Sequence, residues 1–243
     1  MIDSFDSPDP YELLFCPGEA PWGDGNPCAM ENVVAGVVGG ERDVFVETRG
    51  EPRAISAIGM VGYEPSYEAG ILALATYGFG DLGSASYVIL QYDGVDDDEA
   101  ETIWPALTNS EQLNTDLTGD GTNTAFVFGF LGLDAGSNRD SLDLNIVVNG
   151  PEGSAAYSGA IPESPLAFNH TVDFADFTVA GANPFNAATS VTITLNNPTT
   201  PSKNIDFELD SISAIPEPST LGLLALGCLG CLVGVTARRW RRR

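Results

Sequence analysis

Residues Asn204–Ser213 read NIDFELDSIS, and their alternation decides the fold class. Apolar side chains occupy positions 205, 207 and 209, and carboxylates occupy positions 206, 208 and 210. Successive side chains of a β-strand point to opposite faces, so this period of two predicts a strand with one buried and one solvated face. The stretch therefore predicts a sheet that covers an apolar core.

Short β-type runs of this kind recur along the chain, separated by Gly, Asp, Asn and Pro. No stretch before residue 215 shows a sustained helical period. With 27 Gly and 16 Pro in 243 residues, this spacing predicts an all-β, jelly-roll-like sandwich of two sheets. The ten expected strands are Val33–Val38, Asp43–Thr48, Ala54–Gly62, Gly70–Tyr77, Ser86–Tyr92, Thr124–Leu133, Leu142–Val148, Thr171–Val179, Ser190–Leu195 and Asn204–Ser213.

The charge of the chain is unusual. It has 34 acidic residues against 10 basic ones, and half of the basic residues are arginines in the last six positions. The part before Pro216 holds 33 acidic and five basic residues, a net charge of −28. Such a surface repels phosphate backbones, which argues against nucleic acid as a partner. We expect salt or divalent cations to stabilise this part by relieving the repulsion.

The C-terminal end has the composition of a membrane anchor. Ser219–Ala237 contains 19 residues without a formal charge, which as a helix span about 28 Å, close to the ~30 Å hydrocarbon core of a bilayer. Core helices are usually amphipathic, whereas this stretch is small or apolar on all faces. The arginines that follow predict a cytoplasmic end and a stop-transfer signal; they are Arg238, Arg239, Arg241, Arg242 and Arg243.

A short motif precedes this predicted transmembrane helix. Pro216-Glu217-Pro218 favours an extended backbone, because each proline fixes its own φ and disfavours the helical region for the residue before it. An extended backbone just outside the membrane is a shape that an enzyme can bind. The order of Pro-Glu-Pro, Ser-Thr, a leucine- and glycine-rich span and terminal arginines, from Ile215 to Arg243, resembles the PEP-CTERM sorting signal of bacterial proteins handled by exosortases.

The resemblance implies how such a protein is sorted. A membrane-embedded, cysteine-dependent, transpeptidase-like exosortase would recognise Pro216-Glu217-Pro218 and remove the anchor. The precursor would lie in the inner membrane with its body outside the cytoplasm, and the processed protein would reach the cell surface or the extracellular space. Family members belong to Gram-negative bacteria that make exopolysaccharide and biofilm. The implied partners are the exosortase, the membrane and exopolysaccharide.

The body also resembles the jelly-roll ectodomains that are common among PEP-CTERM proteins. This resemblance implies a β-sandwich and brings no known catalytic residue with it. We therefore expect a Pro/Gly-rich segment 1–30, a β-sandwich ectodomain 31–214 and a sorting signal 215–243. The segments that carry the resemblance are Ile2–Asp6, Gly39–Val44, Leu90–Gly94, Asp116–Thr118 and Asn204–Asp210.

The N-terminal segment raises two expectations. Met1–Pro10 has neither the basic nor the apolar stretch of a signal peptide, so we expect the export signal to lie upstream of Met1. Cys16 and Cys28 lie twelve residues apart in Pro/Gly-rich sequence. In an oxidising compartment they predict a disulfide that would stabilise the fold by ~3 kcal/mol. The alternative is a pair of free, buried thiols.

The sequence contains no motif of a known catalytic nucleophile. Its single histidine, His170, stands at an expected strand start without a Gly-x-Ser-x-Gly elbow. Carboxylates are too abundant for one glycosidase-type pair to stand out. We therefore predict a protein that is not an enzyme, with a hydrolase as the least favoured alternative.

Calcium is the one cofactor that the sequence raises. Asp116–Gly121 reads DLTGDG, with Asp at positions 1 and 5 and Gly at position 6 of an EF-hand-like loop. Position 12, which should be a bidentate glutamate, is Val127. The pattern favours an Asp-Gly turn over a metal site, with Asp116 and Asp120 as the candidate ligands. The acidic run Asp93–Glu101 favours a solvated loop.

Two classes of function fit these observations. We favour a non-enzymatic surface or matrix protein that an exosortase sorts and processes. The alternative is a carbohydrate-binding module, which would present aromatic side chains on a concave sheet face, and exposed coplanar rings would favour it. The same rings could instead be core or rim residues. The candidate aromatics are Tyr63, Tyr67, Tyr77, Tyr87, Tyr92 and Trp104.

Overall fold

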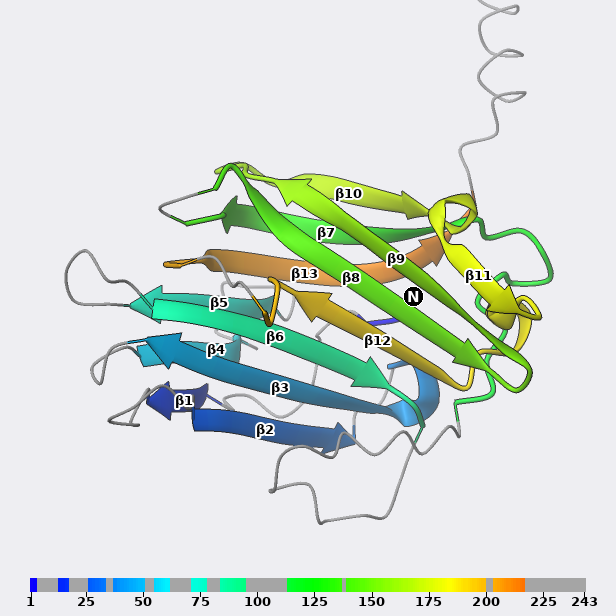
Figure 1. The fold of residues 1–243 in the computed structure, drawn as a ribbon, viewed down its shortest axis with the longest axis horizontal. Helices are drawn as coiled ribbons and strands as arrows, with labels where there is room; N and C mark the ends of the chain where they lie inside the picture. Colours follow the sequence, from blue (N-terminus) through cyan, green and yellow to red (C-terminus); the bar gives the residue numbers. More distant parts are fainter. Residues whose placement is uncertain are drawn as a thin grey trace, which may run out of the picture.

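Two antiparallel β-sheets pack face to face and enclose one apolar core (Figure 1). The computed structural model describes residues 1–3, 13–17, 26–33, 37–50, 55–61, 71–77, 84–94, 113–136, 139–199 and 203–216. Sheet A has the strand order β1 (Leu13–Pro17), β4 (Ile55–Val61), β5 (Ile71–Tyr77), β13 (Asp206–Ile215), β7 (Ala125–Asp134) and β10 (Phe168–Asp173). Sheet B has the order β11 (Thr178–Gly181), β9 (Gly153–Pro162), β8 (Ser141–Gly150), β12 (Ser190–Leu195), β6 (Ser84–Tyr92), β3 (Glu41–Gly50) and β2 (Asn26–Val33).

The chain crosses repeatedly between the two sheets, so that neighbours in a sheet are often distant in sequence. β13, for example, lies between β5 and β7, and β12 lies between β8 and β6. Such crossing is typical of a jelly-roll-like sandwich. The helical elements of the described residues are three 3-10 turns, η1 (Val38–Gly40), η2 (Phe174–Asp176) and η3 (Pro184–Ala187). The prediction of an all-β, two-sheet sandwich is confirmed.

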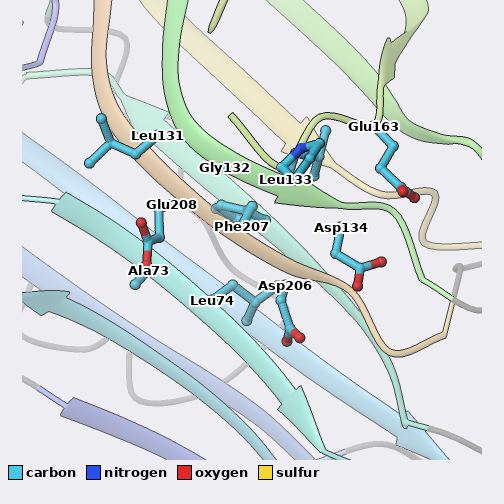
Figure 2. A pocket seen from close by; sticks show the side chains of 11 residues that line it. Ala73, Leu74, Leu131, Gly132, Leu133, Asp134, Glu163, Asp206, Phe207 and Glu208 are labelled. Atoms are coloured by element: carbon cyan, nitrogen blue, oxygen red, sulfur yellow. The ribbon is translucent and has the colours of Figure 1, made fainter. Parts of the chain in front are cut away.

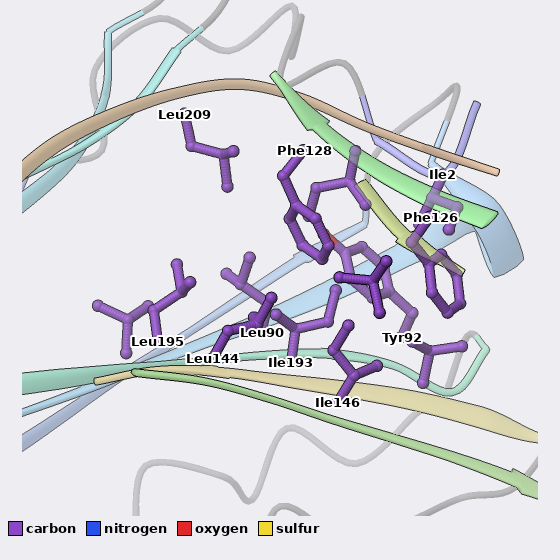
Figure 3. Close-up of a cluster of buried hydrophobic side chains, with 14 of the residues drawn as sticks. Ile2, Leu90, Tyr92, Phe126, Phe128, Leu144, Ile146, Ile193, Leu195 and Leu209 are labelled. Atoms are coloured by element: carbon purple, nitrogen blue, oxygen red, sulfur yellow. The ribbon is translucent and has the colours of Figure 1, made fainter. Parts of the chain in front are cut away.

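The core consists of inward-facing side chains that alternate along the strands. On β8 the side chains at positions 142, 144, 146 and 148 are fully buried, and those between them are half-buried or exposed. Figure 3 shows Phe126 and Phe128 of β7 lying opposite Leu144 and Ile146 of β8. Full burial of one such side chain contributes ~1.5–3 kcal/mol. The burial of the two inner faces is therefore the main force that holds the sheets together.

Aromatic rings close the sandwich at the end where β13 stops. Phe126 on β7 lies with its ring centroid 5.0 Å from that of Phe174 and 6.3 Å from that of Phe185. Phe174 and Phe185 stack at 4.3 Å, and Phe177 meets Phe185 edge-on at 5.1 Å. η2 and η3 supply Phe174 and Phe185. These turns therefore cover one end of the core in addition to connecting strands.

A buried polar cluster joins the N-terminus to both sheets. Asp3 forms an antiparallel bridge with Ile212 of β13, and the Ile212 amide donates to the Asp3 carbonyl at 2.8 Å. The Asp3 carboxylate accepts a 2.5 Å bond from the Arg42 guanidinium on β3 and a 3.0 Å bond from the Tyr92 hydroxyl on β6. All three side chains are fully buried. Burial, together with the charge of Asp3, raises the pKa of the Tyr92 hydroxyl well above its usual value.

Several expected strands differ from the observed ones. Of the expected strand Val33–Val38, Val33 is the last residue of β2 and Val38 the first of η1, whereas residues 34–36 lie outside the described part. There the chain turns at Gly39, whose φ of +82° favours glycine. The expected strand Thr171–Val179 is divided by η2, since β10 pairs with β7 in sheet A and β11 pairs with β9 in sheet B.

Three strands were not expected at all, and each lacks a clear sequence pattern. β9 reads GSAAYSGAIP, with few of the β-branched residues that favour strands. Its pairing with β8 along its whole length sets its conformation instead. β1 and β2 come from the segment that we expected as a Pro/Gly-rich N-terminal unit, and they extend sheets A and B respectively.

The buried cluster predicts a large stability difference between single and double variants. Arg42→Met should lower the free energy of unfolding by about 3–5 kcal/mol, because it leaves the Asp3 carboxylate buried without its guanidinium partner. The double variant Asp3→Asn/Arg42→Met removes both charges and should recover most of the loss. Urea denaturation of the three proteins measures the effect. Equal destabilisation by the single and the double variant would contradict this account.

Candidate functional site

The first candidate region is the point where the chain leaves the sandwich. β13 stays paired with β7 up to its last residue, Ile215, which lies opposite Ala125. The Ile215 carbonyl accepts a 2.8 Å hydrogen bond from the Thr124 amide. Pro216 follows at once and is exposed. The Pro-Glu-Pro motif therefore begins directly after a paired strand in the middle of sheet A, with no spacer between them.

The rest of the predicted sorting signal lies outside the described residues. This applies to Glu217, Pro218, the expected transmembrane helix 219–237 and the arginines at positions 238, 239 and 241–243. Within the described ranges, no helix has both the length and the apolar character needed to cross a membrane.

Two of the six candidate aromatics have side chains that the structure describes, and neither contributes to an exposed platform. Tyr87 and Tyr92 are 2% and 0% exposed. The Tyr87 ring lies 5.9 Å from that of Phe45, and Tyr92 belongs to the buried cluster described above. These two residues are therefore structural. Tyr63, Tyr67 and Trp104, and the side chain of Tyr77 on β5, lie outside the described part.

The two N-terminal cysteines lie on edge strands of different sheets. Cys16 is on β1, opposite Ser56 of β4, and Cys28 is on β2, opposite Val46 of β3. β1 forms one edge of sheet A and β2 one edge of sheet B. The side chains of both cysteines lie outside the described part, so their disulfide stays a prediction.

In the EF-hand-like loop, the carboxylate of Asp116 accepts hydrogen bonds from other groups of the same loop. Asp116 accepts hydrogen bonds from the Thr118 hydroxyl at 2.5 Å, the Thr118 amide at 2.8 Å and the Asp120 amide at 2.7 Å. These bonds, above all the one from the Thr118 hydroxyl, hold the pKa of Asp116 below its usual value. Among the described residues no group of three or more metal-ligating side chains could hold a metal ion. The arrangement is that of a turn closed by hydrogen bonds.

His170 has no catalytic partner among the described residues. It lies on β10 opposite Phe128, and its half-buried ring follows the inward-facing Phe168 along the strand. The Nε2 atom is buried without a hydrogen-bond partner in the described part of the chain. Burial lowers the pKa of His170 below its usual value. Burial therefore favours the neutral form of the ring.

The second candidate region is a groove of about 450 Å³ on sheet A, which we call the sheet-A groove (Figure 2). It lies over β5, β7 and β13, beside the segment that joins β9 to β10. Its volume is within the range of small-molecule sites, ~300–1,000 Å³. Its lining residues are Ala73, Leu74, Leu131, Gly132, Leu133, Asp134, Glu163, Pro165, Asp206, Phe207 and Glu208.

A β-bulge opens this groove. The pairing of β13 with β7 shifts between Glu208 and Leu209, because Glu208 lies opposite Gly132 whereas Leu209 lies opposite Phe130. Leu131 is the extra residue and is 38% exposed. A Cβ atom added to Gly132 would meet nothing within 4 Å, so the space beside Glu208 is open. Ala73, on the other side of Glu208, is also small.

Four acidic residues line the groove, namely Asp134, Glu163, Asp206 and Glu208. Two of them occupy opposed positions on neighbouring strands. Asp206 of β13 lies directly opposite Asp134 of β7. Like charges in directly opposed cross-strand positions are unfavourable, by roughly 0.2–1 kcal/mol. Glu208 and Glu163 form no ion pair within the described part of the chain.

Comparison with known protein families locates the sorting signal. The profile described as the PEP-CTERM protein-sorting motif matches residues 214–243. The chain carries a PEP-CTERM sorting motif. Its boundary coincides with the end of β13, since the match begins one residue before Ile215. The PEP-CTERM motif implies an exported protein that is sorted through its C-terminus.

Comparisons of the whole chain are less informative. No curated protein matches it. Among solved structures, the family 11 carbohydrate-binding module from Clostridium thermocellum in complex with a β-1,3-1,4-mixed-linked tetrasaccharide is 13% identical, with a TM-score of 0.37 over 79% of this chain and 96% of that one. The family 11 module of a cellulosomal cellulase from the same organism is 11% identical, with a TM-score of 0.35 over 83% of this chain and 92% of that one.

The sequence predicts only some of the residues that line the sheet-A groove. The alternation at positions 204–213 correctly placed the carboxylates of Asp206 and Glu208 on the solvent face. Asp134 and Glu163 carried no comparable signal, because their place beside β13 depends on pairings between strands that are distant in sequence. The bulge at Leu131 likewise has no clear sequence pattern.

The Asp116 loop predicts the response to calcium. Millimolar calcium should raise the melting temperature no more than sodium chloride of equal ionic strength, because the Asp116 oxygens already accept hydrogen bonds within the loop. Both salts should give some gain by screening the acidic body. Differential scanning calorimetry in the two salts measures this. A calcium gain well above the ionic-strength effect would show that Asp116 and Asp120 form a real metal site.

His170 predicts part of the acid sensitivity of the fold. Its pKa is lower in the folded than in the unfolded state, where it is about 6.5. The stability that the neutral ring contributes is thus present above pH ~6.5 and is lost as the pH falls toward the folded pKa. His170→Gln should show a smaller fall in melting temperature between pH 7 and pH 5 than the wild type. An unchanged fall would contradict the burial argument.

Proposed function

We propose that this protein is a non-enzymatic component of the cell surface or extracellular matrix, processed at Pro216–Pro218 by an exosortase. The observation that carries the proposal is the PEP-CTERM motif at residues 214–243. In the precursor, residues 219–237 span the inner membrane and the terminal arginines stay in the cytoplasm. The sandwich then lies outside the cytoplasm, in contact with exopolysaccharide.

The position of the motif supports this role. Because β13 is paired up to Ile215, the sandwich of the precursor lies immediately above the membrane. The two prolines keep the chain extended and prevent the transmembrane helix from continuing toward the sandwich. An extended segment is the form that enzymes bind as an added strand. The arginines hold the precursor in place, since moving each through hydrocarbon costs several kcal/mol.

The rigid end of the sandwich restricts where cleavage takes place. The Ile215 carbonyl is held by the Thr124 amide, and the aromatic cluster around Phe126 packs behind that end of sheet A. Fraying of β13 is therefore unfavourable. The exosortase has to bind the motif at the surface of a folded body, and the first residue available to it is Pro216.

The proposal predicts the fate of a motif variant. Pro216→Ala/Pro218→Ala lets the helix continue through Glu217 and hides the extended motif. The variant should therefore keep its C-terminal peptide and stay in the inner membrane. Mass spectrometry of membrane and extracellular fractions distinguishes the forms, because a peptide that contains Trp240 reports the uncleaved anchor.

A matched control separates recognition of the motif from a general effect of proline replacement. Pro151 is exposed in the turn between β8 and β9, and Pro151→Ala should be processed as the wild type is. The proposal fails if the mature wild-type protein outside the inner membrane still contains Trp240, because the tail would then be a permanent anchor.

A further inference from the structure

The two halves of β13 have different neighbours in sheet A. On one side β7 pairs with β13 from Asp206 to Ile215, and on the other side β5 pairs with it from Asp206 to Leu209. Past Leu209, residues 1–3 bond to β13 on the side that β7 does not occupy. We call residues 1–3 the N-terminal strap. It takes over from β5 along the part of β13 that leads to the sorting motif.

The strap joins β13 through a β-bulge. The amides of Ile2 and Asp3 both donate to the Ile212 carbonyl, at 2.9 and 3.0 Å, and the Ile212 amide donates to the Asp3 carbonyl at 2.8 Å. Two residues thus oppose one, which is the pattern of a bulge. The bulge explains why Ile2 and Asp3 are 1% and 0% exposed, although successive side chains of a regular strand point to opposite faces.

Each residue of the strap has a different contact. Ile2 belongs to the apolar core, and its carbonyl accepts a 2.9 Å bond from the Val38 amide of η1. The Asp3 carboxylate is bound by the buried polar cluster of sheet B. Met1 is 69% exposed, and its sulfur accepts a 3.2 Å bond from the Ser213 hydroxyl. The strap is therefore anchored in both sheets, while Met1 stays at the surface.

The strap contacts β13 close to the sorting motif. Its partners, Ile212 and Ser213, come shortly before Pro216. Release of the strap would leave residues 210–215 with their pairing to β7 as the remaining row of strand hydrogen bonds among the described residues. In extended conformation, residues 210–215 reach about 20 Å. An enzyme that binds its substrate as an added strand needs a free segment of this kind.

We propose that the N-terminal strap limits how far the sorting motif can be drawn from the sandwich, and so controls its access to the processing enzyme. With the strap in place, residues 210–215 stay in sheet A, and the enzyme binds the chain from Pro216 onward. When the strap leaves, residues 210–215 open together. The strap is a positioning element and takes no part in cleavage. This inference rests on the proposed function, because the enzyme is the exosortase proposed there.

Hydrogen exchange of the full chain in detergent tests how strongly the strap holds β13. Ile2→Ala removes the apolar anchor of the strap and leaves the charges of the buried polar cluster unchanged. It should speed exchange of the amides of residues 210–215 at least about tenfold relative to those of residues 206–209, which β5 and β7 both hold. Ile2→Val should change the same ratio in the same direction by a smaller factor, and it replaces Ile2→Ala if that variant does not fold.

Ile161→Ala is the matched control. Ile161 lies on β9 of sheet B and is 0% exposed, so the same substitution removes a similar apolar contact away from the strap. It should lower the melting temperature by a similar amount and leave the exchange ratio of residues 210–215 to residues 206–209 unchanged. A uniform change along β13 in Ile2→Ala would overturn the inference, because the strap would then contribute to global stability alone.

Pulse labelling of cells that contain an exosortase tests the consequence for processing. Ile2→Ala should lose the peptide that contains Trp240 at least about threefold faster than the wild type, because cleavage after a rapid opening follows the population of the open form. Ile161→Ala should lose it at the wild-type rate. Equal rates for Ile2→Ala and the wild type would mean that the strap does not control access. Failure of the proposed function is distinguishable, because Trp240 would then remain in the wild type too, and the exchange measurement needs no exosortase.

Discussion

The Asp3 carboxylate lies buried between the two sheets, and the side chains that stabilise it there come from two strands of sheet B. Arg42 on β3 and Tyr92 on β6 both donate to it, while the main chain of Asp3 bridges Ile212 on β13 of sheet A. A buried charge without such partners would cost several kcal/mol. The cluster therefore couples the N-terminus, the central strand of sheet A and two strands of sheet B into one cooperative unit.

β13 connects the core, the sheet-A groove and the start of the sorting motif. Its inward side chains, such as Phe207 and Leu209, belong to the core. Its outward carboxylates, Asp206 and Glu208, line the sheet-A groove. Its last residue, Ile215, is still paired when the sorting motif begins. One ten-residue strand thus links the stability of the sandwich, the sheet-A groove and the sorting of the protein.

The sequence predicts those features that depend on local order and misses those that depend on pairing. β12 matches its expected strand, and β8 and β13 agree with theirs within two residues, because their alternation is regular. The sorting motif can be predicted from the sequence because its parts are consecutive in the chain. By contrast, β9 is a strand because β8 pairs with it, and the burial of Arg42 follows from the position of Asp3 in space. The opposition of Asp134 and Asp206 depends on a bulge between distant strands, which no local pattern encodes.

The central claim is that β13 remains folded to its end and passes directly into the sorting motif. Hydrogen exchange of the full-length precursor in detergent, followed by mass spectrometry of overlapping peptides, tests it most directly. The account predicts slow exchange of the amides from Phe207 through Ile215, with a sharp change to fast exchange at Glu217. Fast exchange that begins at Ile212 or earlier would contradict it, because the motif would then follow a frayed spacer and not a paired strand.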